Sequence, residues 1–312
     1  MDVILVTLLN GVVYGLLLFM VSAGLTLVFG MMGVLNFAHA SFYMLGAYAG
    51  FAVSRYIGFW PGLLVGASVA AAVGVYVERG LLQRVRRFGH TQELLLTFGV
   101  AFVVEEVVKA LFGPYPVAYG IPEALRFTAF SVGQSQVPFF RILIGLTALA
   151  MFAVIFVLLR FTRVGLVVRA AVLRPQMVSM LGHNVPAVFT ALFALGAGMA
   201  GLAGAVGGAF YSTTPNMAVE LGVLVFVVVV VGGLGSLGGA LAASLLIGVG
   251  VSFVVSVDAS LGLVLQRLGL LASAPSTGLL SVPVSASAGM LPYALMLLVL
   301  MVRPSGFAGD RS

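Results

Sequence analysis

Long apolar runs separated by short polar stretches dominate the chain. A helix needs roughly 20 apolar residues to cross the hydrocarbon layer of a membrane, and several runs approach or exceed that length. The pattern predicts spans at residues 3–29, 38–53, 62–77, 94–112, 139–159, 188–209, 221–231, 240–257 and 291–302. We therefore expect an all-α fold, a polytopic transmembrane helical bundle of about eight or nine spans that forms one domain over residues 1–312.

Charged residues are scarce and lie between the apolar runs. They make up 8% of the sequence, whereas soluble domains carry about 25%. Arginines cluster at residues 79–87 and 160–174, and positive residues gather in the cytoplasmic loops of membrane proteins. We therefore place both clusters in the cytoplasm and the chain in a lipid membrane. The net charge of +6 reflects this topology and does not indicate a nucleic-acid surface.

One membrane stretch, GMMGVLNFAHASFYMLGAY at residues 30–48, is unusually polar. In a helix, Asn36, His39 and Tyr43 would fall at i, i+3 and i+7 on one face. A discontinuous helix that lines a substrate path has such a polar face beside loosening glycines. We expect a broken or re-entrant helix near residues 30–40, with these three side chains on the path. Hydrogen bonding to a neighbouring helix is the alternative role for them.

A second polar group lies in the predicted span 94–112. Glu105 lies four residues before Lys109 and Glu106 three residues before it, so both carboxylates can pair with the lysine along a helix. Charges at this depth must face protein or water. A paired cluster that faces the bundle and an ion-coupling site are both compatible with this spacing.

Glycines concentrate in two runs. Gly198, Gly201, Gly204 and Gly207 recur every three residues, and a second run covers residues 232–239. Small residues let helix backbones approach closely in lipid. The first run therefore predicts close helix packing, and the second predicts a tight break between two spans.

The second arginine cluster opens the longest predicted cytoplasmic loop, residues 160–186. A short amphipathic helix in this loop would end at Gly182. Its apolar face would consist of Val172, Met177, Met180 and Leu181. Such a helix can dock into a groove on a partner or lie in the lipid interface, and composition does not separate the two.

Several chemistries lack the residues they need. A phosphate-binding P-loop needs Gly-Lys-Ser/Thr, but the one lysine of the chain, Lys109, is followed by Ala110. The chain has no cysteine, and His39, His90 and His183 lie in three separate segments, so no metal site is expected. We expect no catalytic residue and no cofactor in this chain. A pore, a secondary transporter or the membrane subunit of a larger machine remains.

Four stretches together resemble one family. They are GLTLVFGMMGVLNFAHASFYMLGAY, LLLTFGVAFVVEEVVKALFG, the pair LRPQMVSMLGHNVPAVFTALFALGAGMAGLAGA and VVVVVGGLGSLGGALAASLLIGV, and the terminal VRPSGFAG. The chain is similar in these stretches to permeases of the branched-chain amino-acid type of ABC importer. The Asn-Phe-Ala-His and Gly-Gly-Leu-Gly-Ser blocks are specific in combination.

The resemblance implies an inner-membrane subunit of a larger importer. A second homologous permease subunit, two cytoplasmic ATPases that bind ATP and Mg²⁺, and an extracytoplasmic substrate-binding protein would complete it. The loop around residues 169–184 would hold the coupling helix that receives the ATPase stroke. The coupling residues would be Arg169, Val172, Met177, Met180, Leu181 and Gly182.

The sequence departs from the family in two places. Pro175 lies where the coupling helix would begin, and the segment 258–287 is longer than usual. Relatives move leucine, isoleucine and valine, but also other amino acids, urea or amides. We interpret the chain as the permease subunit of an ATP-driven importer for amino acids, and we expect branched-chain amino acids to be its main substrates. The alternative is an ion-coupled secondary transporter of small polar solutes that uses Glu105 or Glu106.

Overall fold

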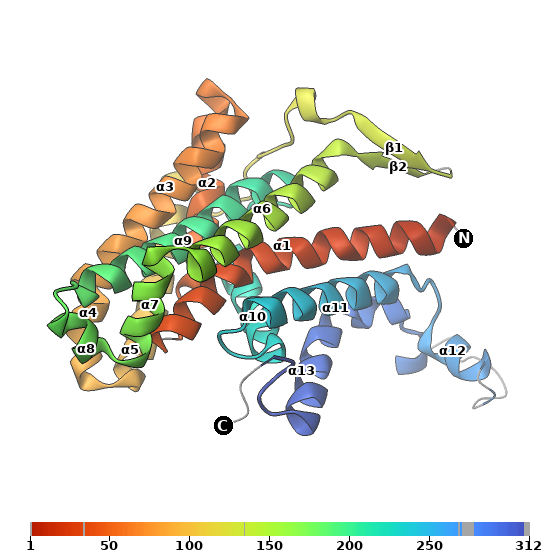
Figure 1. Cartoon of the computed structure of the whole chain (residues 1–312). Helices are drawn as coiled ribbons and strands as arrows, with labels where there is room; N and C mark the ends of the chain where they lie inside the picture. Colours follow the sequence, from red (N-terminus) through yellow and green to blue (C-terminus); the bar gives the residue numbers. More distant parts are fainter. Residues whose placement is uncertain (1, 34, 134, 268, 270–277, 309–312) are drawn as a thin grey trace.

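The computed structural model describes residues 2–33, 35–133, 135–267, 269 and 278–308 of the chain. These residues form a bundle of long helices with one small hairpin (Figure 1). The α-helices are α1 (Asp2–Met32), α2 (His39–Ile57), α3 (Phe59–Tyr76), α4 (Gln83–Val85), α5 (His90–Phe112), α6 (Phe139–Phe161), α7 (Arg163–Leu173), α8 (Pro175–Met180), α9 (Val185–Phe210), α10 (Met217–Gly232), α11 (Leu237–Ser256), α12 (Leu261–Arg267) and α13 (Leu291–Val302). The strands β1 (Thr128–Val132) and β2 (Ser135–Pro138) pair in an antiparallel hairpin. A π-helix (Val77–Leu82) and 3-10 turns (Arg86–Phe88, Glu123–Leu125, Leu279–Ser281 and Val284–Met290) complete the described elements.

The helices confirm the predicted polytopic membrane fold. Among the described residues, six helical stretches are long and apolar enough to cross a membrane. They are Val3–Met32, Phe59–Phe88, Phe139–Phe161, Val185–Phe210, Leu237–Ser256 and Val284–Val302. Helix α10 is apolar but shorter.

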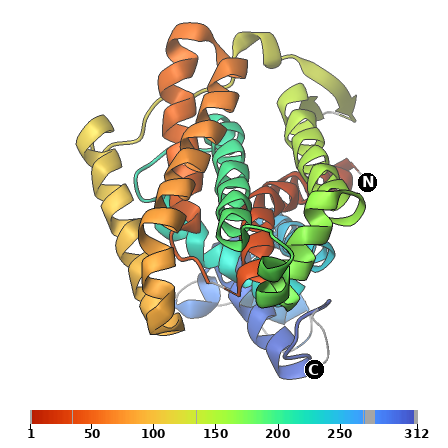
Figure 2. The ribbon, with the colours of Figure 1, turned by 60° about the vertical axis from the view of Figure 1, so that its left-hand side comes forward.

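Helix α9 lies at the centre of the bundle and packs against α1, α2 and α3 (Figure 2). The glycines of α9 make this possible, because the backbone of a neighbouring helix occupies the space that a larger side chain on α9 would need. A Cβ atom at Gly204 would collide with the Tyr43 carbonyl, and one at Gly46 of α2 with the Gly201 carbonyl. The predicted close packing is therefore confirmed.

The second glycine run forms the predicted break between α10 and α11. The Ser236 hydroxyl accepts a hydrogen bond from the Gly239 N–H at 3.1 Å and so caps the start of α11. The terminal segment covers the end of α10, where the Phe307 N–H donates to the Val231 carbonyl at 2.9 Å.

Two predicted segments are described only in part. The described residues do not include 268 and 270–277 of the long segment 258–287. They also do not include 309–312, which begin at the last residue of the terminal stretch VRPSGFAG.

Between α1 and α2 the chain leaves the helical conformation at Gly33 and at residues 35–38, and we call these described residues the α1–α2 segment. Gly33 has a φ of +66°, in the left-handed region that glycine tolerates. The Asn36 Oδ1 accepts a hydrogen bond from the Ala38 N–H at 3.0 Å. Asn36 therefore precedes the helix and does not share a helix face with His39. This corrects the predicted i, i+3, i+7 pattern, because the Asn36 side chain closes the turn before α2.

The interval between the predicted spans 38–53 and 62–77 is almost entirely helical. Helix α2 runs to Ile57 and α3 starts at Phe59, so only Gly58 lies between them. Gly58 has a φ of +96°, which allows the chain to turn within one residue.

The first arginine cluster is helical rather than a loop. Helix α3 continues through the π-helix and α4 to residue 88, and we call residues 77–93 the elbow. The buried Glu78 carboxylate lies 3.0 Å from Arg86 Nη2, and the buried Glu93 carboxylate lies 3.4 Å from Arg86 Nε. Arg86 therefore pairs with two buried glutamates, and this pairing holds the segment against the bundle.

Candidate functional site

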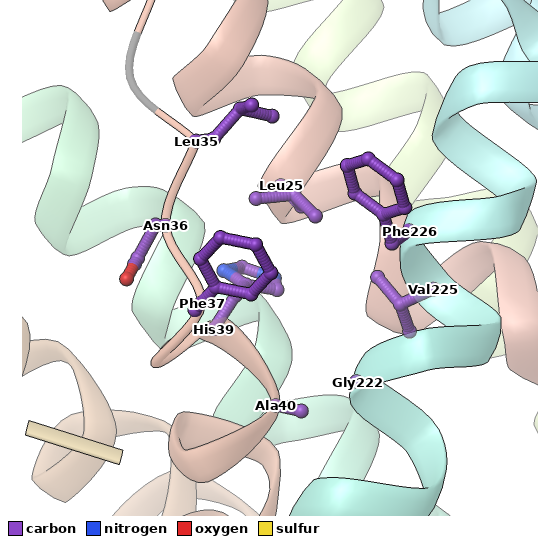
Figure 3. Close-up of a pocket in the computed structure, with 9 residues that line it drawn as sticks. All are labelled: Leu25, Leu35, Asn36, Phe37, His39, Ala40, Gly222, Val225 and Phe226. Carbon is purple, nitrogen blue, oxygen red and sulfur yellow. The ribbon is translucent and has the colours of Figure 1, made fainter. Parts of the chain in front are cut away.

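The α1–α2 segment borders a small cavity of about 30 Å³ between α1, α2 and α10. The close-up shows three lining residues from the segment and two side chains from α10 (Figure 3). The lining residues are Leu25, Leu35, Asn36, Phe37, His39, Ala40, Gly222, Val225 and Phe226. The structure therefore brings two of the predicted path residues, Asn36 and His39, to the same cavity.

Both polar residues are buried and only partly bonded. Asn36 is 4% exposed and His39 is 2% exposed. His39 Nε2 lies 3.0 Å from the Val21 carbonyl of α1, so Nε2 donates and Nδ1 is left as an acceptor in the neutral ring. Among the described residues, Asn36 Nδ2, His39 Nδ1 and the Ser41 hydroxyl have no hydrogen-bond partner.

Buried polar groups without partners are uncommon, because each loses its hydrogen bonds to water and gains nothing in return. Unpartnered donors and acceptors beside a cavity have free capacity for water or for a polar ligand. The bond from His39 to Val21 also joins α2 to α1. The packing role predicted for His39 would use Nε2, and the predicted path role would use Nδ1.

Tyr43, the third predicted path residue, lies elsewhere. Its ring is buried, and a Cβ atom at Gly207 of α9 would collide with its hydroxyl. Tyr43 is absent from the lining of the cavity. Its role on the path stays a prediction, and the structure separates it from Asn36 and His39.

A larger cleft of about 290 Å³ adjoins the cavity and shares Phe37, Gly222 and Phe226 with it. We call it the α2–α5–α10 cleft after the helices that line it. Its other lining residues are Ser41, Phe98, Ala101, Phe102, Glu105, Ala218, Val219 and Val223. The Phe37 N–H donates to the Thr97 hydroxyl of α5 at 3.2 Å, which holds the segment at the cleft.

Aromatic rings form the shared wall of the two spaces. The Phe37 ring stacks on Phe226 with centroids 6.3 Å apart and meets Phe98 edge-on at 6.4 Å. The sequence did not identify these residues as part of a site. In a membrane span an apolar side chain gives no sign of whether it faces lipid or a cleft, so the pattern alone could not have found them.

The charged triplet on α5 is paired as its spacing predicted. Lys109 Nζ lies 2.7 Å from Glu105 Oε1 and 2.9 Å from Glu106 Oε1. The two carboxylates differ in their surroundings. The Glu105 side chain is 11% exposed and lines the cleft, whereas that of Glu106 is 71% exposed and does not.

The loop predicted to be cytoplasmic, residues 160–186, contains two helices, α7 and α8, rather than the single amphipathic helix predicted. Pro175 is the reason, because proline cannot continue α7 but is well suited to the first turn of α8. Val172 lies on α7 and is partly buried, and Arg169 is exposed on the same helix. Gly182 follows α8 with a φ of +86°.

The surface of α8 and the residue after it is apolar and open. Met177, Met180 and Leu181 are 54%, 86% and 78% exposed. Val178 faces inward instead and packs with Ala171 and the start of α9. We call the three exposed residues the α8 patch.

Comparisons with known proteins point to one family. The family model described as branched-chain amino acid transport system / permease component matches residues 7–300. The permease protein LivH of the high-affinity branched-chain amino acid transport system of Escherichia coli K12 is 28% identical over 96% of this chain and 94% of the relative. The corresponding permease protein BraD of Pseudomonas aeruginosa is 27% identical over 79% of this chain and 84% of the relative.

More distant proteins also align along most of the chain. The probable branched-chain amino acid transport permease protein LivH of Methanocaldococcus jannaschii is 25% identical over 96% of this chain and 91% of the relative. A solved structure, PsaBC from Streptococcus pneumoniae in complex with Fab, covers 95% of this chain and 91% of that chain, at 12% identity and a TM-score of 0.45. The match to the family model spans nearly the whole chain, and the chain therefore belongs to the family of permease components of branched-chain amino acid transport systems.

Proposed function

We propose that the chain is the permease subunit of an ATP-driven importer for amino acids, with branched-chain amino acids as its main substrates. The observation that carries this proposal is the family match over residues 7–300, together with the relatives' names. The sequence supports it, because Lys109 is followed by Ala110 and no P-loop can form. ATP hydrolysis then belongs to other subunits.

The partners we propose are a second homologous permease subunit, two cytoplasmic ATPases that bind ATP and Mg²⁺, and an extracytoplasmic substrate-binding protein. The assembly would lie in the cell inner membrane. The six long apolar stretches, with α2 and α5, would make eight spans, and the shorter α10 would make nine.

The α1–α2 segment would be the discontinuous part of the membrane path. Irregular backbone inside a membrane must be buried in protein or line a cavity, and in this segment Asn36 and Ala38 are buried while Gly33 and Phe37 are exposed. Asn36 and His39 present unpartnered polar atoms there, and these atoms could bind a solute in transit.

The α8 patch would be the site where an ATPase docks. Three large apolar side chains exposed beside arginines suit a groove on a cytoplasmic protein, which would remove them from water. Arg169 and Val172 on α7 would flank this contact, and the turn at Gly182 would fix its end.

The ion-coupled alternative has no observation in its favour. The family match leads to an ABC importer.

Reconstitution tests the proposal directly. The purified chain alone in liposomes should neither hydrolyse ATP nor accumulate leucine, and the complete set of partner subunits should give both activities. Accumulation of leucine by the isolated chain in response to a proton or sodium gradient would overturn it.

A further inference from the structure

The α2–α5–α10 cleft combines an apolar wall with isolated polar groups. Phe98, Phe102, Val219 and Val223 supply the wall. Glu105 is the charged residue among its described lining residues. A space of about 290 Å³ lies near the lower end of the roughly 300–1,000 Å³ range of small-molecule sites, so it suits a compact solute.

The polar groups among the lining residues of the cleft are the Ser41 hydroxyl and the Glu105 carboxylate. The Ser41 hydroxyl is buried and has no hydrogen-bond partner among the described residues. The Glu105 carboxylate is held in place by the ion pair with Lys109 at 2.7 Å. Lys109 supplies one cation to Glu105, and the ammonium group of a solute in the cleft can supply further charge-assisted N–H donors to the same carboxylate.

We propose that this cleft is a substrate subsite for α-amino acids with branched aliphatic side chains. The ammonium group of the substrate binds the Glu105 carboxylate and the Ser41 hydroxyl. Its side chain packs against Phe98, Phe102 and Val223. This inference rests on the proposed function and adds to it a residue that recognises the substrate within the permease itself.

The composition of the cleft separates this occupant from two others. A lipid chain would match the apolar wall but would leave the Ser41 hydroxyl without a partner and would add no donor to the Glu105 carboxylate beside Lys109. A second permease subunit could cover the exposed rim at Val219, but a purely apolar contact would not need a carboxylate at its edge. The side chain of such an amino acid matches the apolar wall, and its ammonium group matches the Ser41 and Glu105 oxygens.

Site-directed labelling is clean in this chain because it contains no cysteine. In membranes with the assembled importer, a Val219→Cys thiol should react with a permeant maleimide, and leucine should slow the reaction. The matched control is Val255→Cys on α11, because Val219 and Val255 are both 56% exposed and Val255 lies outside the cleft. Leucine should not change the rate at Val255→Cys.

Two further changes test how the ammonium group is recognised. The carboxylate 4-methylpentanoate, which is leucine without its amino group, should not protect Val219→Cys. In a Val219→Cys background, Glu105→Gln should raise the leucine concentration for half-protection by about tenfold or more, because a charge-assisted bond is lost. Glu106→Gln should leave it within about twofold, because Glu106 shares Lys109 but does not line the cleft.

Three results would overturn the subsite. They are a Val219→Cys thiol that reacts as slowly as one in hydrocarbon, a rate that leucine does not change, and equal effects of the two glutamine variants. If leucine uptake by the complete importer is normal in such a case, the subsite fails and the proposed function stands. If the complete importer transports no amino acid, the proposed function fails as well.

Discussion

The elbow and the α1–α2 segment both bury polar side chains where helices meet, but only those of the elbow have a partner of opposite charge. In the elbow, the carboxylates of Glu78 and Glu93 both reach Arg86, although Glu78 Oε2 and Glu93 Oε1 make no hydrogen bond among the described residues. In the α1–α2 segment, Asn36 and His39 each keep one nitrogen without a partner among the described residues. The elbow lies at the end of a span, and the segment lies between two long helices beside a cavity.

This difference indicates different roles. A buried charge is tolerated when it is paired. Removal of one partner leaves the other charge buried and unpaired, which lowers stability. Changes in the elbow should therefore lower stability. An unpartnered nitrogen contributes little to folding, so changes in the α1–α2 segment should affect transport more than stability.

The largest effect is expected where a new unpaired charge enters a contact. If the α8 patch docks into an ATPase, Leu181→Asp places a carboxylate in a desolvated interface at a cost of several kcal/mol. Co-purification of the ATPase should fall by more than about tenfold, while the permease still inserts, because no buried residue has changed. Val164→Asp, at an exposed position of α7 outside the patch, is the matched control.

A helix that lies in the lipid interface gives a different outcome. Leu181→Asp would then weaken the membrane contact of α8 but leave ATPase recovery unchanged. Normal recovery together with normal transport would move the docking surface elsewhere, with the elbow as the next candidate.

The next effect should come from the elbow itself. Arg86→Met removes the shared cation of Glu78 and Glu93 and should lower the free energy of unfolding in detergent by about 3 kcal/mol. This is the low end of the range for a buried pair, because the Arg86 side chain is 33% exposed. Arg84→Met, at an exposed position in the same turn, should change it by less than about 0.5 kcal/mol. If Arg86→Met and Arg84→Met were equally stable, the ion pairs of the elbow would not contribute to stability, and the elbow would no longer differ from the α1–α2 segment in this respect.

The α1–α2 segment should show the opposite behaviour. His39→Leu and Asn36→Leu should each cut leucine uptake by roughly tenfold or more, while the free energy of unfolding falls by about 1 kcal/mol. Ser22→Ala is the control, because the buried Ser22 hydroxyl already donates to the Phe19 carbonyl at 3.2 Å. That variant should transport normally. Full transport by both leucine variants would assign Asn36 and His39 to packing.

Periodicity and composition predicted the helical membrane fold, and the glycine runs predicted both the dense packing of α9 and the break before α11. The elbow was missed because a run of arginines looks like a solvated loop until its buried glutamates are placed in space. Pro175 was noticed but could be interpreted only when α7 and α8 were seen as separate helices. The cleft was missed because Phe98 and Val223 follow the same apolar pattern as residues that face lipid.

The smallest effect tests whether partnered polar groups act on stability outside the elbow. Tyr119, in the segment between α5 and α6, is 7% exposed, and its hydroxyl donates to the Ala205 carbonyl of α9 at 2.9 Å. Tyr119→Phe keeps the ring but removes this bond, so it should lower the free energy of unfolding by about 1 kcal/mol and leave leucine uptake unchanged. Tyr115→Phe, at a position 78% exposed, should change neither quantity. If Tyr119→Phe reduced uptake at full stability, a fully bonded group would be acting in transport, and bonding would no longer separate structural from functional polar residues in this protein.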